Sequence, residues 1–197
     1  MLDRAWDAAC AQRPNLVDGP CWHVSSVQRN GAGGASIHVV QTTYRMGACR
    51  EAIATGFVGL GVKAVAHWCG RVLVGRRSDA CIAYAGCWEF APSGAAEPGE
   101  EPTAGIAREL MEECALECAR PPRVLGLVFD PRVRNWEIVH EILLAQPPDA
   151  PPNWEYSELA LVDLDAFPAP RSPVTEQLLE CARRIQLRQR SQETPPE

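Results

Sequence analysis

The sequence predicts an α/β or α+β domain in which a mixed sheet lies between helices. Two observations predict this. Runs rich in β-branched and aromatic residues recur along the chain, and an amphipathic helical segment from about Thr103 to Cys114 lies among them. A second helical segment begins at Ser172 and Pro173, an N-cap residue followed by proline at the first helical position. The 197 residues suffice for one domain with a sizeable core.

Residues 1–57 are expected to form an N-terminal extension made of a helix and a β-hairpin. The helix is predicted over 2–12 because the apolar spacing is helical and Pro14 follows. The hairpin is predicted because two runs rich in β-branched residues, 21–28 and 35–45, flank a glycine-rich segment.

Residues 58–190 are expected to form the main domain, and residues 191–197 a disordered tail. The main domain begins with a second hairpin, in which Cys69 and Gly70 join two apolar runs. The runs predicted as strands in this domain are 60–68, 71–77, 87–92, 123–130, 136–145 and 159–167. A proline-rich loop is expected before the last of them.

Composition excludes several classes of protein. The net charge of −6 and the absence of a Lys/Arg block argue against a nucleic-acid polymer as partner. The nine cysteines include no CxxC pair, which argues against a zinc ribbon, and we expect them to be reduced. We find no signal peptide and no run of 18 apolar residues, so we expect a cytoplasmic protein without a membrane span.

A cluster of glutamates on the central helix predicts a metal site. Glu109, Glu112 and Glu113 are spaced i, i+3 and i+4, which puts them on one face of a helix. Their charge alone favours a solvated acidic face, although a carboxylate-rich site also suits Mg²⁺ or Mn²⁺. The residues expected on the opposite, buried arc are Ala107, Leu110, Met111 and Cys114.

The spacing around these glutamates is more specific than their charge. Gly94 is followed by five residues and Glu100, then by seven residues and the run Arg108–Leu116. This pattern resembles the Nudix box, G-x5-E-x7-R-E-U-x-E-E-x-G-U, where U is aliphatic. Ala115 replaces the late glycine. An alanine can take the left-handed conformation that such a glycine often has, at a cost of about 1 kcal/mol.

The flanking segments also resemble the family, over about residues 58–190. The resemblance implies a Nudix-like α/β/α sandwich around a mixed sheet. It also implies an enzyme that uses Mg²⁺ or Mn²⁺ to hydrolyse the diphosphate bond of a nucleoside diphosphate linked to another group.

The resemblance assigns roles by position. Glu109, Glu112 and Glu113 would hold the metal, with help from Glu100 and from Gly94, whose backbone would approach it closely. Arg108 would orient a box carboxylate. The general base would be a box glutamate or a glutamate of a late loop, for which Glu155 and Glu158 are the candidates.

Contacts with substrate are less sharply predicted. Arg76 and Arg77 end a strand and could reach phosphates, or could simply be an exposed strand end. Trp136, Trp154 and Tyr156 could stack on a nucleobase, or belong to the core.

Two observations favour a nucleotide sugar, such as ADP-ribose or UDP-glucose, as the small-molecule partner. Pro131 lies 15 residues after Leu116, as in family members that act on sugar nucleotides, and such members often carry an N-terminal extension that supports a homodimer. A nucleoside triphosphate is the alternative within the same chemistry. The alternatives from other classes are a non-catalytic nucleotide sensor and a prenyl diphosphate isomerase of the same fold.

Overall fold

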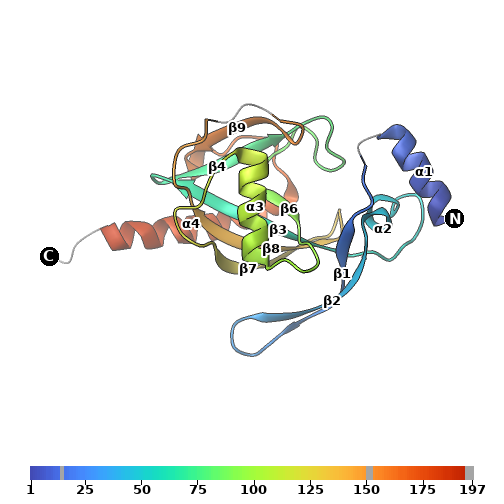
Figure 1. Ribbon diagram of the computed structural model, residues 1–197. Helices are drawn as coiled ribbons and strands as arrows, with labels where there is room; N and C mark the ends of the chain where they lie inside the picture. The colour runs from blue at the N-terminus through green and yellow to red at the C-terminus, as the bar shows by residue number, and fades with distance from the viewer. Residues whose placement is uncertain (14–15, 150–152, 194–197) are drawn as a thin grey trace.

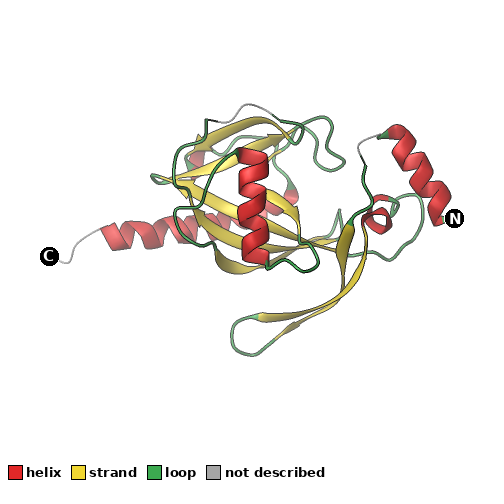
Figure 2. Cartoon of the chain, viewed as in Figure 1, coloured by secondary structure: helices red, strands yellow, loops and turns green. Residues whose placement is uncertain are grey.

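The computed structural model describes residues 1–13, 16–149 and 153–193. Its mixed sheet has α3 across one face and α4 behind the other, and the N-terminal elements project from this body (Figures 1 and 2). The elements are, in order, α1 (Leu2–Gln12), β1 (Pro20–Arg29), β2 (Ala35–Thr43), α2 (Tyr44–Ala48), β3 (Gly59–Trp68), β4 (Arg71–Arg77), β5 (Trp88–Phe90), β6 (Ser93–Ala95), α3 (Pro102–Cys114), β7 (Arg123–Asp130), β8 (Asn135–Leu143), β9 (Tyr156–Val162), the 3₁₀ turn η1 (Leu164–Ala166) and α4 (Pro173–Glu193).

Strand β3 is the centre of the sheet. It runs parallel to β8 and antiparallel to β1, β4 and β6, while β7 pairs with β8. Strand β4 carries β5 and β9. The predicted fold class, a mixed sheet between helices, is therefore confirmed.

The β3–β4 hairpin opens away from its turn. Cys69 and Gly70 have φ of 46° and 76°, the left-handed backbone that a tight two-residue hairpin turn requires. The two strands then pair only at His67–Val72 and Trp68–Arg71, directly beside the turn. Beyond this point β5 pairs with β4 and β6 pairs with β3, so the segment that joins β5 to β6 lies between the two strands.

The core consists of two apolar clusters, one on each face of β3. Val62 and Ala64 pack on the α3 side, whereas Val65 packs on the α4 side. Strand β3 thus alternates between two buried faces, which explains its near-continuous apolar sequence. The residues of α3 that enter the first cluster are Ile106, Leu110 and Cys114.

Several expectations need correction. Met111 is 45% exposed and does not belong to the buried arc of α3, whereas Glu109 and Glu113 are buried. The short elements α2 and β6 were not predicted. Residues 191–193 continue α4 instead of beginning a disordered tail, and the rest of that tail lies outside the described residues. No described helix is long and apolar enough to cross a membrane.

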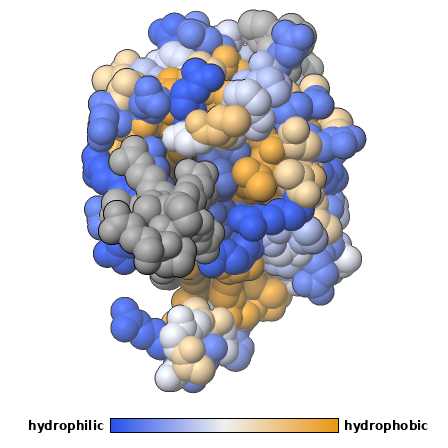
Figure 3. Space-filling model, turned by 90° about the vertical axis from the view of Figure 1, so that its left-hand side faces the viewer, coloured by the Kyte–Doolittle hydropathy of each residue, from blue (hydrophilic) through white to orange (hydrophobic). Residues whose placement is uncertain are grey.

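The N-terminal hairpin joins the body through a short pairing with β3 and through Val24, which belongs to the α3-side core. Strands β1 and β2 pair along most of their length, but β1 meets β3 only at His23–Gly59. Two further hydrogen bonds, Val24 N to Val58 O and Val58 N to His23 Nδ1, reinforce this junction. Figure 3 shows hydrophobic surface at the base of the projecting segment.

The packing of α3 predicts opposite effects for two adjacent residues. Leu110→Ala empties a fully buried position and should lower the free energy of unfolding by about 2–5 kcal/mol. The control is Met111→Ala, which should change it by less than about 1 kcal/mol because the side chain is exposed. Denaturant unfolding measures both values. Equal losses for the two variants would show that the orientation of α3 is wrong.

The end of α3 gives a second stability prediction. Ala115 has φ 53° and ψ 38°, the left-handed conformation expected for the residue that replaces the late glycine. Ala115→Gly removes this strain and should stabilise the protein by about 0.5–1 kcal/mol. Thermal unfolding would measure the gain. A lower melting temperature for this variant would argue against the left-handed cap.

Candidate functional site

Helix α3 and strand β6 together position the box carboxylates. Ser93 N donates to Glu113 Oε2 at 3.1 Å, so the start of β6 lies against the last turn of α3. A Cβ atom built on Gly94 would lie 2.0 Å from Glu109 Cδ. Only a residue without a side chain therefore lets β6 approach Glu109 so closely.

Arg108 binds the surrounding carboxylates from the exposed side of α3. Its Nε and Nη2 donate to the two oxygens of Glu100 at 3.2 and 3.1 Å, and its Nη1 donates to Glu109 and Glu112 at 3.0 Å each. The hydrogen bond to Glu100, together with the charges of Glu109 and Glu112, raises the pKa of Arg108 above its usual range, although burial opposes them. Arg108 thus contacts the box carboxylates, and its role in orienting them stays a prediction.

Glu113 meets a second carboxylate that comes from a distant part of the chain. Glu155, just before β9, lies near Glu113, because Asn153 accepts a hydrogen bond from Glu155 N and donates one to Glu113 O. Burial first, and then the negative charge of Glu155, raise the pKa of Glu113 well above its usual range. Burial also raises the pKa of Glu109 to about 7, against the effect of Arg108. The site therefore holds several carboxylates whose negative charge is disfavoured by their burial.

These side chains fit a divalent cation in chemistry. Carboxylate oxygens are preferred ligands of Mg²⁺ and Mn²⁺. A bound cation would offset the cost of burying the charges of Glu109 and Glu113, which is the main cause of their raised pKa values. The positions of the side chains do not yet form a coordination site. Within the described residues, no three His, Cys, Asp or Glu side chains are already grouped to hold a metal ion. Arg108 Nη1 lies between Glu109 and Glu112 instead.

A polar cavity of about 130 Å³ lies where β3 and β4 have separated. One water needs about 10–15 Å³ of such space, so the cavity has room for a group of many atoms. It is lined mainly by charged and hydroxyl side chains, among them Lys63, Arg77, Tyr84, Glu89, Asp130 and Glu137.

Most charges in the cavity wall are paired. Glu89 accepts from Lys63 Nζ at 2.9 Å and from Arg77 Nη1 at 2.7 Å, and these cations hold its pKa below the usual range although burial opposes them. Tyr84 Oη donates to Asp130 at 2.6 Å. Glu137 differs, because its Oε2 is buried without a hydrogen-bond partner among the described residues. A bound molecule with an N–H or O–H group could satisfy it.

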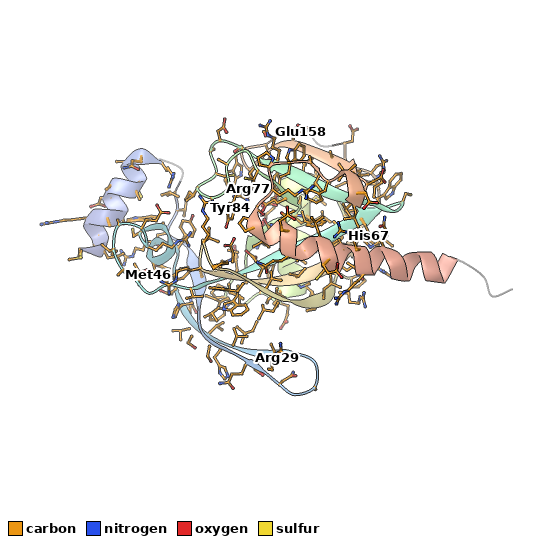
Figure 4. The ribbon with its side chains drawn as sticks, turned by 180° about the vertical axis from the view of Figure 1, so that it is seen from behind. Arg29, Met46, His67, Arg77, Tyr84 and Glu158 are labelled. Atoms are coloured by element: carbon orange, nitrogen blue, oxygen red, sulfur yellow. The ribbon has the colours of Figure 1, made fainter. Side chains whose placement is uncertain are left out.

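The residues predicted to contact substrate lie in different parts of the structure. Arg77 lines the cavity and lies near Tyr84, whereas Glu158 lies at the upper edge of the molecule (Figure 4). Arg76 is exposed and is paired across the ladder with the equally exposed Glu158. Trp136 packs on Phe129, with ring centroids 4.9 Å apart, at the margin of the α3-side core.

The two other aromatic candidates also lie outside the cavity wall. Tyr156 is fully buried in the core on the α3 side, and Trp154 is 73% exposed. Neither position supports stacking within the cavity. Of the two late glutamates, only Glu155 is brought to the box.

Lys63, Glu89 and Asp130 line the cavity, although no pattern in the sequence predicted them there. Lys63 and Glu89 are single charges within apolar strands, and such residues are seldom buried unless they are paired. A single charge within an apolar strand marks each residue as unusual. It does not predict that β3 and β5 bring the two charges together.

The comparisons with known proteins agree on one family. The family model described as NUDIX domain matches residues 61–184. Two solved structures are each 25% identical: the MutT NUDIX hydrolase from Burkholderia pseudomallei (TM-score 0.52, 61% of this chain and 95% of that chain) and the MutT protein from Methanosarcina mazei Go1 (0.54, 64% and 93%). The NUDIX domain of Shewanella oneidensis NrtR, solved with ADP ribose, is 24% identical (0.53, 64% and 86%), a likeness of fold alone. No curated protein matches the chain.

The raised pKa of Glu109 predicts how stability depends on pH without metal. Its pKa of about 7 lies above the usual 4.5, so the folded state favours the protonated form. This contribution is complete below about pH 4.5 and is lost as the pH rises through 7, amounting to up to about 3 kcal/mol.

Thermal unfolding in EDTA at pH 5 and pH 8 tests this dependence. Glu109→Gln should reduce the loss of stability between the two pH values, whereas Glu112→Gln, at an exposed position, should not. Mg²⁺ should restore stability at pH 8. An unchanged pH dependence in Glu109→Gln would exclude the buried carboxylate as its source.

Proposed function

The chain belongs to the Nudix family and is a pyrophosphohydrolase, and from this premise we propose that it uses Mg²⁺ or Mn²⁺ to cleave the diphosphate bond of a nucleoside diphosphate linked to another group. The observation that supports the proposal is that Asn153 links Glu155 to Glu113 by hydrogen bonds, while β6 packs against Glu113 and against the box carboxylate Glu109. The arrangement of these carboxylates is costly for folding and useful for binding cations.

The roles of the residues follow from their positions. Glu109, Glu112 and Glu113 would hold the metal, with Glu100 and the backbone of Gly94 nearby. A divalent cation bound there supplies positive charge to the phosphates and makes a coordinated water more acidic. A carboxylate of the Glu113–Glu155 pair accepts the proton from the attacking water. Arg108 keeps the carboxylates oriented through its hydrogen bonds.

The cavity between β3 and β4 supports a location for the rest of the substrate. Arg77 contributes to the cavity wall and also contacts Glu155, so the cavity and the carboxylates adjoin. Lys63 and Arg77 provide donors, and Glu137 provides an acceptor that is not yet paired. A nucleotide presents both kinds of group.

We favour a nucleotide sugar such as ADP-ribose or UDP-glucose as substrate. Pro131 in the β7–β8 turn and the N-terminal extension support this choice. A nucleoside triphosphate is the second candidate, since the box carboxylates would serve either reaction. The small-molecule partner in both cases is a nucleoside diphosphate derivative, and the extension is compatible with a homodimer.

The alternatives from other classes have less support. A non-catalytic sensor has no need of the complete set of box carboxylates that this chain keeps. An isomerase of prenyl diphosphates would need a cysteine in the site. Cys114, in the box itself, is fully buried in the core, where burial raises the pKa of its thiol above the usual range.

A substrate panel tests the proposed function. Purified protein with Mg²⁺ is incubated with ADP-ribose, UDP-glucose, nucleoside triphosphates and isopentenyl diphosphate, and the products are separated by chromatography. We expect hydrolysis of a nucleotide sugar that stops in EDTA. Glu113→Gln should lower kcat by about 100-fold or more, because it removes a buried carboxylate of the pair.

Glu117→Gln is the matched control, since Glu117 is exposed beyond the end of α3. Its kcat should match that of the wild-type protein. Binding of a nucleotide without turnover would instead favour the sensor, and turnover that survives in Glu113→Gln would contradict the assigned roles.

A further inference from the structure

Asn153 ties the loop that carries Glu155 to the end of α3. Its Oδ1 accepts hydrogen bonds from the backbone N–H groups of Glu155 and Tyr156, at 2.9 and 2.8 Å. Its Nδ2 donates to the main-chain oxygen of Glu113. That oxygen belongs to the last turn of a helix, where carbonyl groups lack a partner within the helix. One side chain therefore fixes the loop and satisfies the helix end at the same time.

A second set of contacts holds the same loop from the side of β4. Ser78 N donates to Glu155 O at 2.7 Å, and Ser78 Oγ donates to Trp154 O. The thiol of Cys81 also donates to Glu155 O, at 3.4 Å. The main chain at Glu155 is thus bound from two directions, by Asn153 on one side and by Ser78 and Cys81 on the other.

The carboxylate of Glu155 is held by Arg77, which is itself held in place. Arg77 Nη1 donates to Glu155 Oε1 at 3.1 Å and to Glu89 Oε1 at 2.7 Å, and its Nε donates to Ala83 O at 2.9 Å. Glu89 is 3% exposed. If Arg77 moved away, this buried carboxylate would lose one of its two cations.

We propose that Asn153 and Arg77 are positioning residues that hold Glu155 beside Glu113. Every contact that holds the segment is made by another group of the protein, so its position depends on no bound molecule and the reaction needs no closure of this segment. The role of Glu155 in chemistry rests on the proposed function, whereas the docking of the loop does not. The rate of a reaction depends strongly on how closely a catalytic group is held to its productive position.

Amide hydrogen exchange tests the docking directly. In the wild-type protein without ligand, we expect the amides of Glu155 and Tyr156 to be protected, because Asn153 Oδ1 accepts from both. Asn153→Ala should accelerate their exchange at least tenfold. Asp149→Asn, at an exposed position earlier in the same loop, is the control and should leave it unchanged.

Asn153→Asp separates the two functions of the side chain. It keeps an oxygen for both amides but has no donor for Glu113 O, so protection should persist in part. Rapid exchange in the wild-type protein, or protection that appears only after Mg²⁺ and AMP are added, would overturn the proposal in favour of a loop that closes on its ligand.

Steady-state kinetics test the consequence for catalysis. Asn153→Ala should lower kcat by about 10- to 100-fold while KM changes less than about threefold, because it leaves Glu155 present but misplaced. Arg77→Lys should lower kcat by a similar factor and also raise KM, because Arg77 lines the cavity as well as holding Glu155. Asn153→Asp should recover part of kcat. Melting temperatures confirm that each variant is folded before it is assayed.

The two arms distinguish the possible failures. If the wild-type protein hydrolyses no member of the panel, the proposed function fails, and the exchange arm still decides whether Asn153 docks the loop. If exchange accelerates but kcat stays at the wild-type value in both variants, the hydrolase assignment stands and the positioning role of Asn153 and Arg77 is wrong.

Discussion

The burial of carboxylates is the constraint on which the rest of the structure depends. A buried negative charge needs a cation or a proton, and the molecule solves this differently at each position. Glu89 receives Lys63 and Arg77, and Glu109 receives Arg108. Glu113 is the exception, because its side chain accepts from the backbone N–H of Ser93 and otherwise lies near two further carboxylates, Glu155 and Glu109. Glu113, the buried carboxylate whose charge is least neutralised by the protein, lies where we propose that the reaction takes place.

Local patterns made much of the fold predictable. The positions of α3, β3, β4 and β7 follow from periodicity and turn residues over short stretches. The box glutamates were identifiable for the same reason, since their spacing lies within one helix. Met111 was misplaced because β6 packs beside Glu109 and Glu113 and turns the buried side of α3 toward them. That contact involves another element and leaves no trace in the helical pattern.

The remaining features of the candidate site depend on contacts between distant segments. Glu89 meets Arg77 because β5 pairs with β4, and Glu155 reaches Glu113 because β9 pairs with β4 from the other side. Asn153 resembles any other loop residue until its partners are known. These groups could not be predicted because their partners are distant in the sequence. The contacts themselves are well formed, with short hydrogen bonds in the folded protein.

The short pairing of β3 and β4 leaves room for another piece of chain between them. Beyond the Cys69–Gly70 turn the two strands no longer pair with each other. Ala91 N donates to Leu73 O of β4, and Ala64 N of β3 donates to Pro92 O, so the segment between β5 and β6 is bonded to both strands. The same segment brings Glu89 to the cavity wall and Gly94 to Glu109, so one short insertion connects the cavity with the carboxylates of α3.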